Sequence, residues 1–217
     1  NGALYITRTS VYENEKCRLG GKVAVYEMPE DRSPEIDSLT DFMLIERLMS
    51  SGANAGVPLR AAIKRIKLVF TDVDGVLTDG GMFYTRAGDT GKMFNTRDGM
   101  GFELLRKKGY VAGIITKENS EVVLKRAAKL KLEEVYVGVD DKLALVKDLC
   151  RKYSVSIEDV AYIGDDVNDV PVLKAVGLPV SVADAQPEAK SCARYITAAR
   201  GGQGAFRELA RLLLDEK

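Results

Sequence analysis

The fold of this chain is decided by the segment Ile66-Lys67-Leu68-Val69-Phe70-Thr71-Asp72-Val73-Asp74-Gly75-Val76-Leu77-Thr78. Its first half is a short apolar run typical of a buried strand, and Asp72 and Asp74 follow directly. Ligands of α/β proteins bind beyond the carboxyl ends of the strands, so this position favours a ligand site. Taken alone, the segment fits a strand followed by an Asp-rich turn equally well.

The residues after this segment alternate between strand-like and helix-like patterns. We expect strands at 67–73, 111–116, 135–139, 160–164, 178–182 and 194–197, and helices at 101–108, 120–130, 142–153, 169–175 and 206–214. Residues 80–96 suit a hairpin. This alternation predicts an α/β fold, with a parallel central sheet covered by helices.

The chain divides into three expected parts. Residues 1–49 contain β-like stretches at 3–7 and 22–27 and a helix-like stretch at 39–49. Residues 50–65 begin with a Gly-, Ser-, Asn- and Ala-rich run, which favours a linker. Residues 66–217 form the α/β domain. Because the first residue is Asn1 rather than Met, we expect the chain to be a piece of a longer protein.

Composition excludes several classes of function. Among the 217 residues, Lys plus Arg equal Asp plus Glu at 32 each, which argues against a nucleic-acid partner. No apolar stretch approaches the roughly 20 residues needed to span a bilayer, so no membrane partner is expected. The three cysteines lack CxxC spacing, which favours reduced thiols in the cytoplasm. The chain has no His, which excludes Ser-His-Asp and Cys-His catalysis.

Three further polar features follow apolar stretches, as Asp72 and Asp74 do. They are Thr116, Lys142 and the run Gly164-Asp165-Asp166-Val167-Asn168-Asp169. Each has an ordinary interpretation, since Thr commonly ends a strand, Lys commonly starts a solvated helix, and acidic residues commonly cap helices. Their joint occurrence in this order is informative, because the carboxyl ends of parallel strands gather at one edge of the sheet.

These four features, within residues 66–215, resemble the haloacid dehalogenase superfamily of aspartate-nucleophile phosphatases. The resemblance implies that Asp72 attacks phosphorus to form an aspartyl-phosphate, and that Asp74 protonates the leaving alkoxide and then activates water. It also implies a Mg²⁺ ion held by Asp72, Asp165 and the backbone carbonyl of Asp74.

The resemblance also implies roles for the remaining residues of these features, which contact the phosphoryl group or hold the metal. Lys142 offsets negative charge, and Thr116 donates a hydrogen bond to a phosphoryl oxygen. Asp166 and Asp169 either hold the metal through its waters or orient Lys142.

The intervals from Asp72 to Thr116 and from Thr116 to Lys142 are too short for a large cap domain. An open site needs cover, most simply from a neighbouring subunit. The runs at 97–101 (RDGMG) and 200–205 (RGGQGA) resemble capless, tetrameric sugar-acid phosphatases acting on 3-deoxy-D-manno-octulosonate 8-phosphate or 2-keto-3-deoxynononate 9-phosphate. This resemblance implies a homotetramer.

The resemblance also implies four substrate-binding residues, and two further residues that depart from it are candidates for contacts to a different sugar. Four lie in the two glycine-containing runs and two follow Thr116, where the octulosonate enzymes have Gly-Arg: Arg97, Gly99, Arg200 and Gly202, then Lys117 and Glu118. The alternative for residues 201–204 is a simple hinge.

Residues 1–49 are similar to the C-terminal end of acylneuraminate cytidylyltransferases. Glu35 and Asp37 occupy the positions of that family's metal-binding carboxylates, although Glu35 replaces the usual Asp, and the nucleotide-binding beginning is absent. We therefore expect a Mg²⁺-dependent phosphatase for a phosphorylated 2-keto-3-deoxy sugar acid within a bifunctional protein. One alternative is a CMP-sialate synthetase whose phosphatase-like domain is a tetramerisation module, and another is a purely non-catalytic assembly module.

Overall fold

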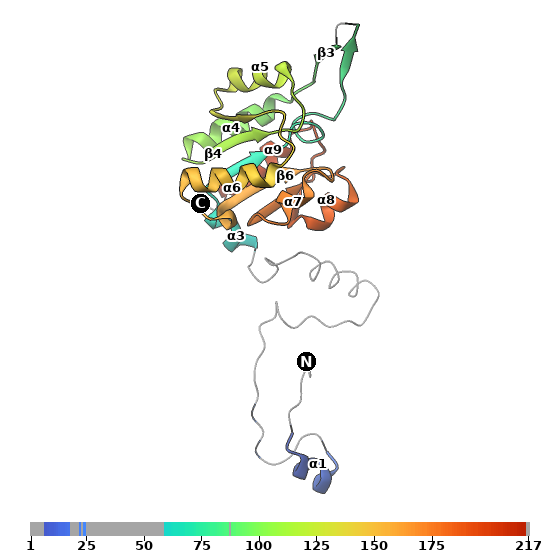
Figure 1. The fold of residues 1–217 in the computed structure, drawn as a ribbon. Helices are drawn as coiled ribbons and strands as arrows, with labels where there is room; N and C mark the ends of the chain where they lie inside the picture. The colour runs from blue at the N-terminus through green and yellow to red at the C-terminus, as the bar shows by residue number, and fades with distance from the viewer. Residues whose placement is uncertain (1–6, 18–21, 23, 25–58, 87, 216–217) are drawn as a thin grey trace. The chain divides into compact units, whose positions relative to one another are not determined.

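The computed structural model describes residues 7–17, 22, 24, 59–86 and 88–215 (Figure 1). The chain divides into two units, Asn1–Leu48 and Met49–Lys217. In the first unit, the described residues form one helix, α1 (Thr9–Glu15), which the sequence patterns did not predict. The predicted stretches at 3–7, 22–27 and 39–49 lie almost wholly outside the described residues.

The second unit is built on a six-stranded sheet in the order β5-β4-β1-β6-β7-β8, in which every pair of neighbouring strands is parallel. The strands are β1 (Leu68–Thr71), β4 (Val111–Ile115), β5 (Glu134–Tyr136), β6 (Val160–Gly164), β7 (Leu178–Ser181) and β8 (Tyr195–Ile196). The predicted α/β fold with a parallel central sheet is confirmed.

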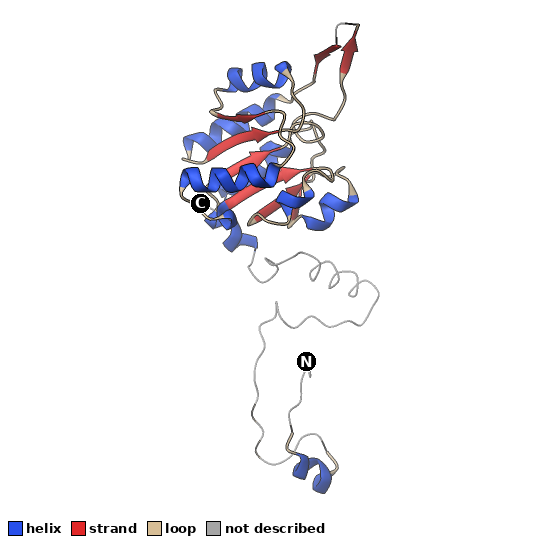
Figure 2. Ribbon diagram, in the orientation of Figure 1, coloured by secondary structure: helices blue, strands red, loops and turns tan. Residues whose placement is uncertain are grey.

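Helices lie on both faces of this sheet (Figure 2). They are α3 (Leu59–Arg65), α4 (Thr96–Lys107), α5 (Glu121–Leu130), α6 (Lys142–Tyr153), α7 (Val170–Leu173), α8 (Pro187–Cys192) and α9 (Ala205–Asp215), with a 3-10 turn, η3 (Ile157–Asp159). Helix α4 packs against α9, and α7 packs against both α6 and α8. None of the described helices is long and apolar enough to cross a bilayer.

Two helical segments differ from the sequence prediction. Helix α3 occupies part of the expected linker at 50–65, because Ala62 and Ile63 are buried in the core. Helix α4 begins at Thr96 rather than near residue 101, since the Asn95 side chain accepts a hydrogen bond from the Arg97 N–H and caps the helix. The residues of the RDGMG run therefore lie in the first turns of a helix.

The segment between β1 and α4 contains an antiparallel hairpin, β2 (Phe83–Thr85) and β3 (Gly88–Gly91), as predicted. It projects away from the sheet (Figure 1). The side chains of Met82, Phe83 and Tyr84 are exposed on it. No larger cap is present among the described residues between Asp72 and Thr116.

Strand register brings the predicted catalytic residues to one edge of the sheet. Thr71, at the end of the fully buried β1, pairs with Ile114 of β4 and Ile163 of β6. Because the three central strands end at nearly the same level, the residues after them, including Asp72 and Asp165, lie together.

Candidate active site

Asp72 is a buried carboxylate, 4% exposed, directly after β1. Its Oδ1 accepts a hydrogen bond from the Val73 N–H at 2.7 Å, and its Oδ2 lies 2.6 Å from the Nζ of Lys142. Burial, followed by the negative charge of Asp169, raises the pKa of Asp72 to about 7 despite the opposing effect of Lys142. Asp72 is therefore a desolvated carboxylate held in one orientation, as a nucleophile requires.

Lys142 bridges two buried carboxylates. It is the first residue of α6, whose N-cap Asp141 accepts a hydrogen bond from the Ala144 N–H, and its Nζ lies 2.6 Å from both Asp72 Oδ2 and Asp169 Oδ1. Burial opposes its charge, but the two carboxylates outweigh burial and raise the pKa of Lys142. Lys142 is thus a fixed positive charge beside Asp72.

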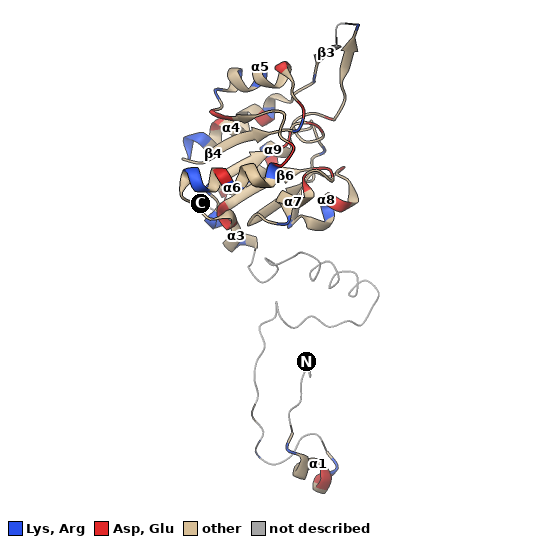
Figure 3. Cartoon of the chain, in the orientation of Figure 1, with Lys and Arg blue, Asp and Glu red and all other residues tan. Residues whose placement is uncertain are grey.

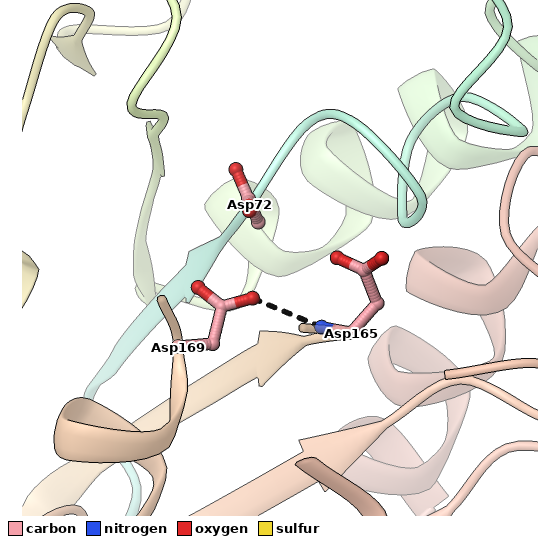
Figure 4. Close-up of side chains that lie close together, drawn as sticks. All are labelled: Asp72, Asp165 and Asp169. Atoms are coloured by element: carbon pink, nitrogen blue, oxygen red, sulfur yellow. Dashed lines mark hydrogen bonds between the residues drawn. The ribbon is translucent and has the colours of Figure 1, made fainter. Parts of the chain in front are cut away.

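Asp169 organises the loop after β6. Its Oδ1 accepts hydrogen bonds from Lys142 Nζ and from the Tyr162 hydroxyl, and its Oδ2 accepts the N–H of Asp165 at 2.9 Å (Figure 4). Both oxygens are therefore engaged by protein donors. Of the two roles expected for Asp169, the contacts match orientation of Lys142. Asp166 instead accepts the Val167 N–H.

The carboxylate of Asp165 has an oxygen without a hydrogen-bond donor in the described part of the chain. Its Oδ1 is buried and has no hydrogen-bond partner among the described residues. Burial, then the charges of Asp72, Asp169 and Asp166, raises the pKa of Asp165 to about 8. A Cβ on Gly75 would lie 2.0 Å from Asp165 Oδ2, and Gly75 has φ +80°, so only glycine fits beside this carboxylate.

The cluster fits a divalent cation. Carboxylate oxygens of Asp72, Asp165 and Asp169 lie within 4.8 Å of one another (Figure 4). Both oxygens of Asp169 and both oxygens of Asp72 have protein donors, whereas Asp165 Oδ1 has none among the described residues, so Asp165 is the open ligand and Asp72 would share an oxygen between its donor and the metal. A hard cation such as Mg²⁺ prefers these ligands, would satisfy the orphaned Asp165 Oδ1 and would offset the burial and the repulsion that raise both pKa values.

Asp74 lies on the loop beyond Asp72, with its side chain partly exposed. Its Oδ1 lies 2.6 Å from the Nζ of Lys92 and 3.4 Å from the Thr78 hydroxyl. Lys92 also pairs with Glu118. Sequence reasoning missed Lys92, because a single Lys in a hairpin carries no motif and only the fold reveals its burial.

A cavity of about 650 Å³ opens over these groups. Its lining includes most of the predicted chemistry: Asp72, Asp74, Thr116, Lys117, Glu118, Asp165 and Asp166. It also includes residues that were not predicted to belong to the site: Gly75, Asp79, Gly80, Met82, Asn168, Asp184 and Gln186. Acidic residues gather among the loops near the carboxyl end of β6 (Figure 3). Thr116 is buried, and its hydroxyl accepts the Glu118 N–H.

Four predicted substrate-binding residues do not line this cavity: Arg97, Gly99, Arg200 and Gly202. Arg97 is exposed and Gly99 is buried, both in the first turn of α4. The glycine-rich segment, residues 200–205, packs against the loop that carries Asp74, since the Gly202 N–H donates to the Val76 carbonyl. A Cβ on Gly201 would lie 1.9 Å from the Gly75 carbonyl oxygen, so the two loops pack backbone to backbone.

Asp98 is a second buried carboxylate with an unusual pKa, and it lies outside the cavity. Its Oδ1 accepts the Arg207 N–H at the start of α9, whereas its Oδ2 is buried without a described partner. Burial raises its pKa to about 6, although the backbone N–H of Arg207 and the charge of Arg126 oppose this shift. The fold therefore favours protonated Asp98.

We expect Asp98→Asn to stabilise the protein near neutral pH and not near pH 4. Because the folded pKa lies above the ordinary value of 3.8, stability is lost as pH rises from about 4 to about 6. Asn retains an oxygen for the Arg207 N–H and cannot ionise, so the variant should gain up to about 3 kcal/mol at about pH 7.5. Urea unfolding of both proteins at the two pH values measures this gain. An equal difference at both values would contradict the prediction.

Comparison with known proteins agrees with this geometry. Residues 110–209 match the haloacid dehalogenase-like hydrolase family. The chain is 42% identical over 154 residues to the 3-deoxy-D-manno-octulosonate 8-phosphate phosphatase KdsC of Escherichia coli K12, covering 71% of this chain and 82% of that protein. The enzyme of the same name from Haemophilus influenzae Rd is 35% identical over 157 residues, covering 72% and 87% of the two chains.

A solved structure of the corresponding phosphatase from Moraxella catarrhalis, in complex with magnesium ion, phosphate ion and a KDO molecule, superposes with a TM-score of 0.70. It is 36% identical, and the match covers 73% of this chain and 91% of that chain. Three findings lead to one conclusion. They are the sequence identity over most of the length of these relatives, the shared fold, and the carboxylate site suited to Mg²⁺ at the carboxyl edge of the sheet. The chain belongs to the haloacid dehalogenase family of phosphatases and is a phosphomonoester hydrolase.

Proposed function

We propose that this protein is a Mg²⁺-dependent phosphatase that hydrolyses a phosphorylated 2-keto-3-deoxy sugar acid through an aspartyl-phosphate. One observation carries the proposal: a buried Asp72, paired with Lys142, lies beside the unsatisfied Asp165 at the base of an open cavity. This arrangement combines a nucleophile, a fixed cation and a metal-binding carboxylate around the position of one phosphoryl group.

The residues divide the reaction into two displacements. A carboxylate oxygen of Asp72 bonds to phosphorus as the bond from phosphorus to the sugar oxygen breaks, and Asp74 gives its proton to that oxygen. Asp74 then takes a proton from water, which attacks phosphorus and releases phosphate and free Asp72. Lys142 and Thr116 stabilise the transferring group. Asp72, Asp165 and the Asp74 carbonyl would hold Mg²⁺, which would supply Lewis-acid stabilisation of phosphoryl oxygens.

The named relatives act on 3-deoxy-D-manno-octulosonate 8-phosphate, which supports an eight- or nine-carbon sugar-acid phosphate as the substrate class. Lys117 and Glu118 line the cavity and contact the sugar in this proposal. Arg97, Gly99, Arg200 and Gly202 act at a site completed by a neighbouring subunit of a homotetramer. The exposed Met82, Phe83 and Tyr84 of the hairpin support such an assembly, because a second chain would bury them.

The N-terminal resemblance supports a finer assignment. In this assignment the phosphatase is one part of a bifunctional cytoplasmic protein that also activates a sugar of the sialic-acid type by cytidylyl transfer. The phosphatase substrate is then a nonulosonate 9-phosphate. The competing assignment is a cytidylyltransferase whose phosphatase-like domain serves only for tetramerisation. The pairing of Asp72 and Asp74 with Lys142 and Lys92 favours the enzyme, since an assembly module has no need of these buried charges.

Phosphate release from a panel of substrates tests the assignment. The panel contains octulosonate 8-phosphate, nononate 9-phosphate and N-acetylneuraminate 9-phosphate, each with Mg²⁺ and with excess EDTA. We expect one compound to be preferred by at least about 10-fold in kcat/KM, with no release in EDTA. No turnover of any compound by a chain that light scattering shows to be tetrameric would favour the assembly module.

A further inference from the structure

The geometry points to Lys92 as a positioning residue that holds Asp74 in its working orientation and ties it to Glu118 on the sugar-contacting loop. This inference rests on the proposed role of Asp74 as the acid and base of the reaction. Lys92 follows β3, at the base of the hairpin, and belongs to none of the four catalytic motifs.

The burial of Lys92 requires its partners to stay in place. Its side chain is 0% exposed, and its Nζ forms ion pairs with Asp74 Oδ1 at 2.6 Å and with Glu118 Oε2. An ammonium removed from water is costly unless its partners are well placed, and loss of both carboxylates would leave a buried charge uncompensated. Asp74 and Glu118 both line the cavity, whereas Lys92 is not one of its lining residues.

The contacts restrict Asp74 to one arrangement. Lys92 and the Thr78 hydroxyl both approach Oδ1, and no described side chain is bonded to Oδ2. Oδ2 is therefore the oxygen left for the leaving group and for the attacking water. Rotation of Asp74 out of this arrangement breaks the pair with Lys92, so the ammonium selects the productive rotamer before substrate arrives.

The second ion pair of Lys92, with Glu118, reaches the loop after β4. The Glu118 N–H donates to the hydroxyl of Thr116, the residue expected to contact the phosphoryl group. One ammonium therefore connects the carboxylate beside the sugar with the carboxylate beside the scissile bond. Displacement of Glu118 by a poorly fitting sugar would disturb Asp74 through Lys92.

Lys92→Met tests this role, because Met keeps the length and apolar stem of Lys but cannot bind Asp74. We expect kcat for the sugar-acid phosphate to fall about 10²-fold to 10³-fold, the usual contribution of a positioned acid and base. The leaving group of p-nitrophenyl phosphate needs no proton, so the variant should still transfer its phosphoryl group to Asp72. Hydrolysis of the aspartyl-phosphate should be slow, because Asp74 activates water poorly. A burst of p-nitrophenolate equal to the enzyme concentration should therefore appear in the variant.

The matched controls separate orientation from packing. Lys107→Met removes an exposed ammonium that pairs with Glu103 on α4, and it should leave kcat unchanged without a burst. Lys92→Arg restores the charge and the donors, so it should recover at least about 10-fold of the lost kcat. If Lys92 acted only through packing, the Met variant would be more active than the Arg variant, because Met fits the site of Lys better than the larger Arg does. Should Lys92→Met alone not fold, the double variant Lys92→Met/Glu118→Gln removes one of the two carboxylates left without a cation and should show the same burst.

The outcomes distinguish this inference from the proposed function. Asp74→Asn is measured beside Lys92→Met, and full activity of Asp74→Asn would remove the assigned role of Asp74. Loss of activity in Asp74→Asn, with Lys92→Met as active as the unaltered protein, would overturn the role of Lys92 alone. So would an Arg variant less active than the Met variant.

Discussion

Asp72→Asn is expected to lower turnover of the phosphorylated sugar acid by at least about 10⁴-fold while the domain remains folded. An amide cannot attack phosphorus, and the first displacement of the proposed reaction has no other nucleophile. Asn can still accept the Val73 N–H, and Lys142 keeps its pair with Asp169, so the local structure should survive. Phosphate release and thermal unfolding of the same preparation measure both parts of this expectation.

Asp148→Asn is the matched control for this substitution. Asp148 is exposed on α6 and pairs with Arg151, so the same chemical change there should leave turnover unaltered. Retention of more than about a tenth of the activity by Asp72→Asn would contradict the assignment of the nucleophile, because direct attack by water would then suffice.

Lys142→Met is expected to damage both stability and catalysis. Removal of the ammonium leaves Asp72 and Asp169 buried beside each other without a cation, and breaking such a buried pair typically costs about 3–5 kcal/mol. Mg²⁺ should restore part of this loss, since the proposed metal site includes Asp72. Urea unfolding with and without Mg²⁺ measures the effect, and phosphate release should fall by at least about 10²-fold.

Lys147 offers the control on the same helix, because its side chain is exposed. Lys147→Met should change stability by no more than about 0.5 kcal/mol. If Lys142→Met were as stable as Lys147→Met, Lys142 would not be the cation that the buried carboxylates require.

Local sequence patterns predicted the parallel sheet well, for physical reasons. The strands are short apolar runs buried on both faces, as β1 and β6 show, and this burial produces a clear signal. Helix α6 begins and ends as predicted, with Asp141 as its N-cap. Helix α4 begins earlier than predicted, because hydrophobic periodicity does not register the cap at Asn95 or a first turn that contains Gly99.

The candidate site was predictable where its chemistry lies at strand ends. Asp72 and Asp165 directly follow β1 and β6, and Lys142 is the first residue of α6, so the fold alone brings them together. Lys92 was not predictable, because its burial depends on three segments that meet only in the folded chain. The glycines at 201 and 202 had a clear sequence signal, but their close approach to the Asp74 loop needed the structure.

The central claim is that Asp72 carries the phosphoryl group during turnover. Borohydride added during steady-state hydrolysis with Mg²⁺ reduces an aspartyl-phosphate to homoserine, which peptide mass spectrometry locates in the sequence. We predict homoserine at position 72, present only when both substrate and Mg²⁺ are supplied. Steady phosphate release with Asp72 unmodified, or with the label at another carboxylate, would contradict the account.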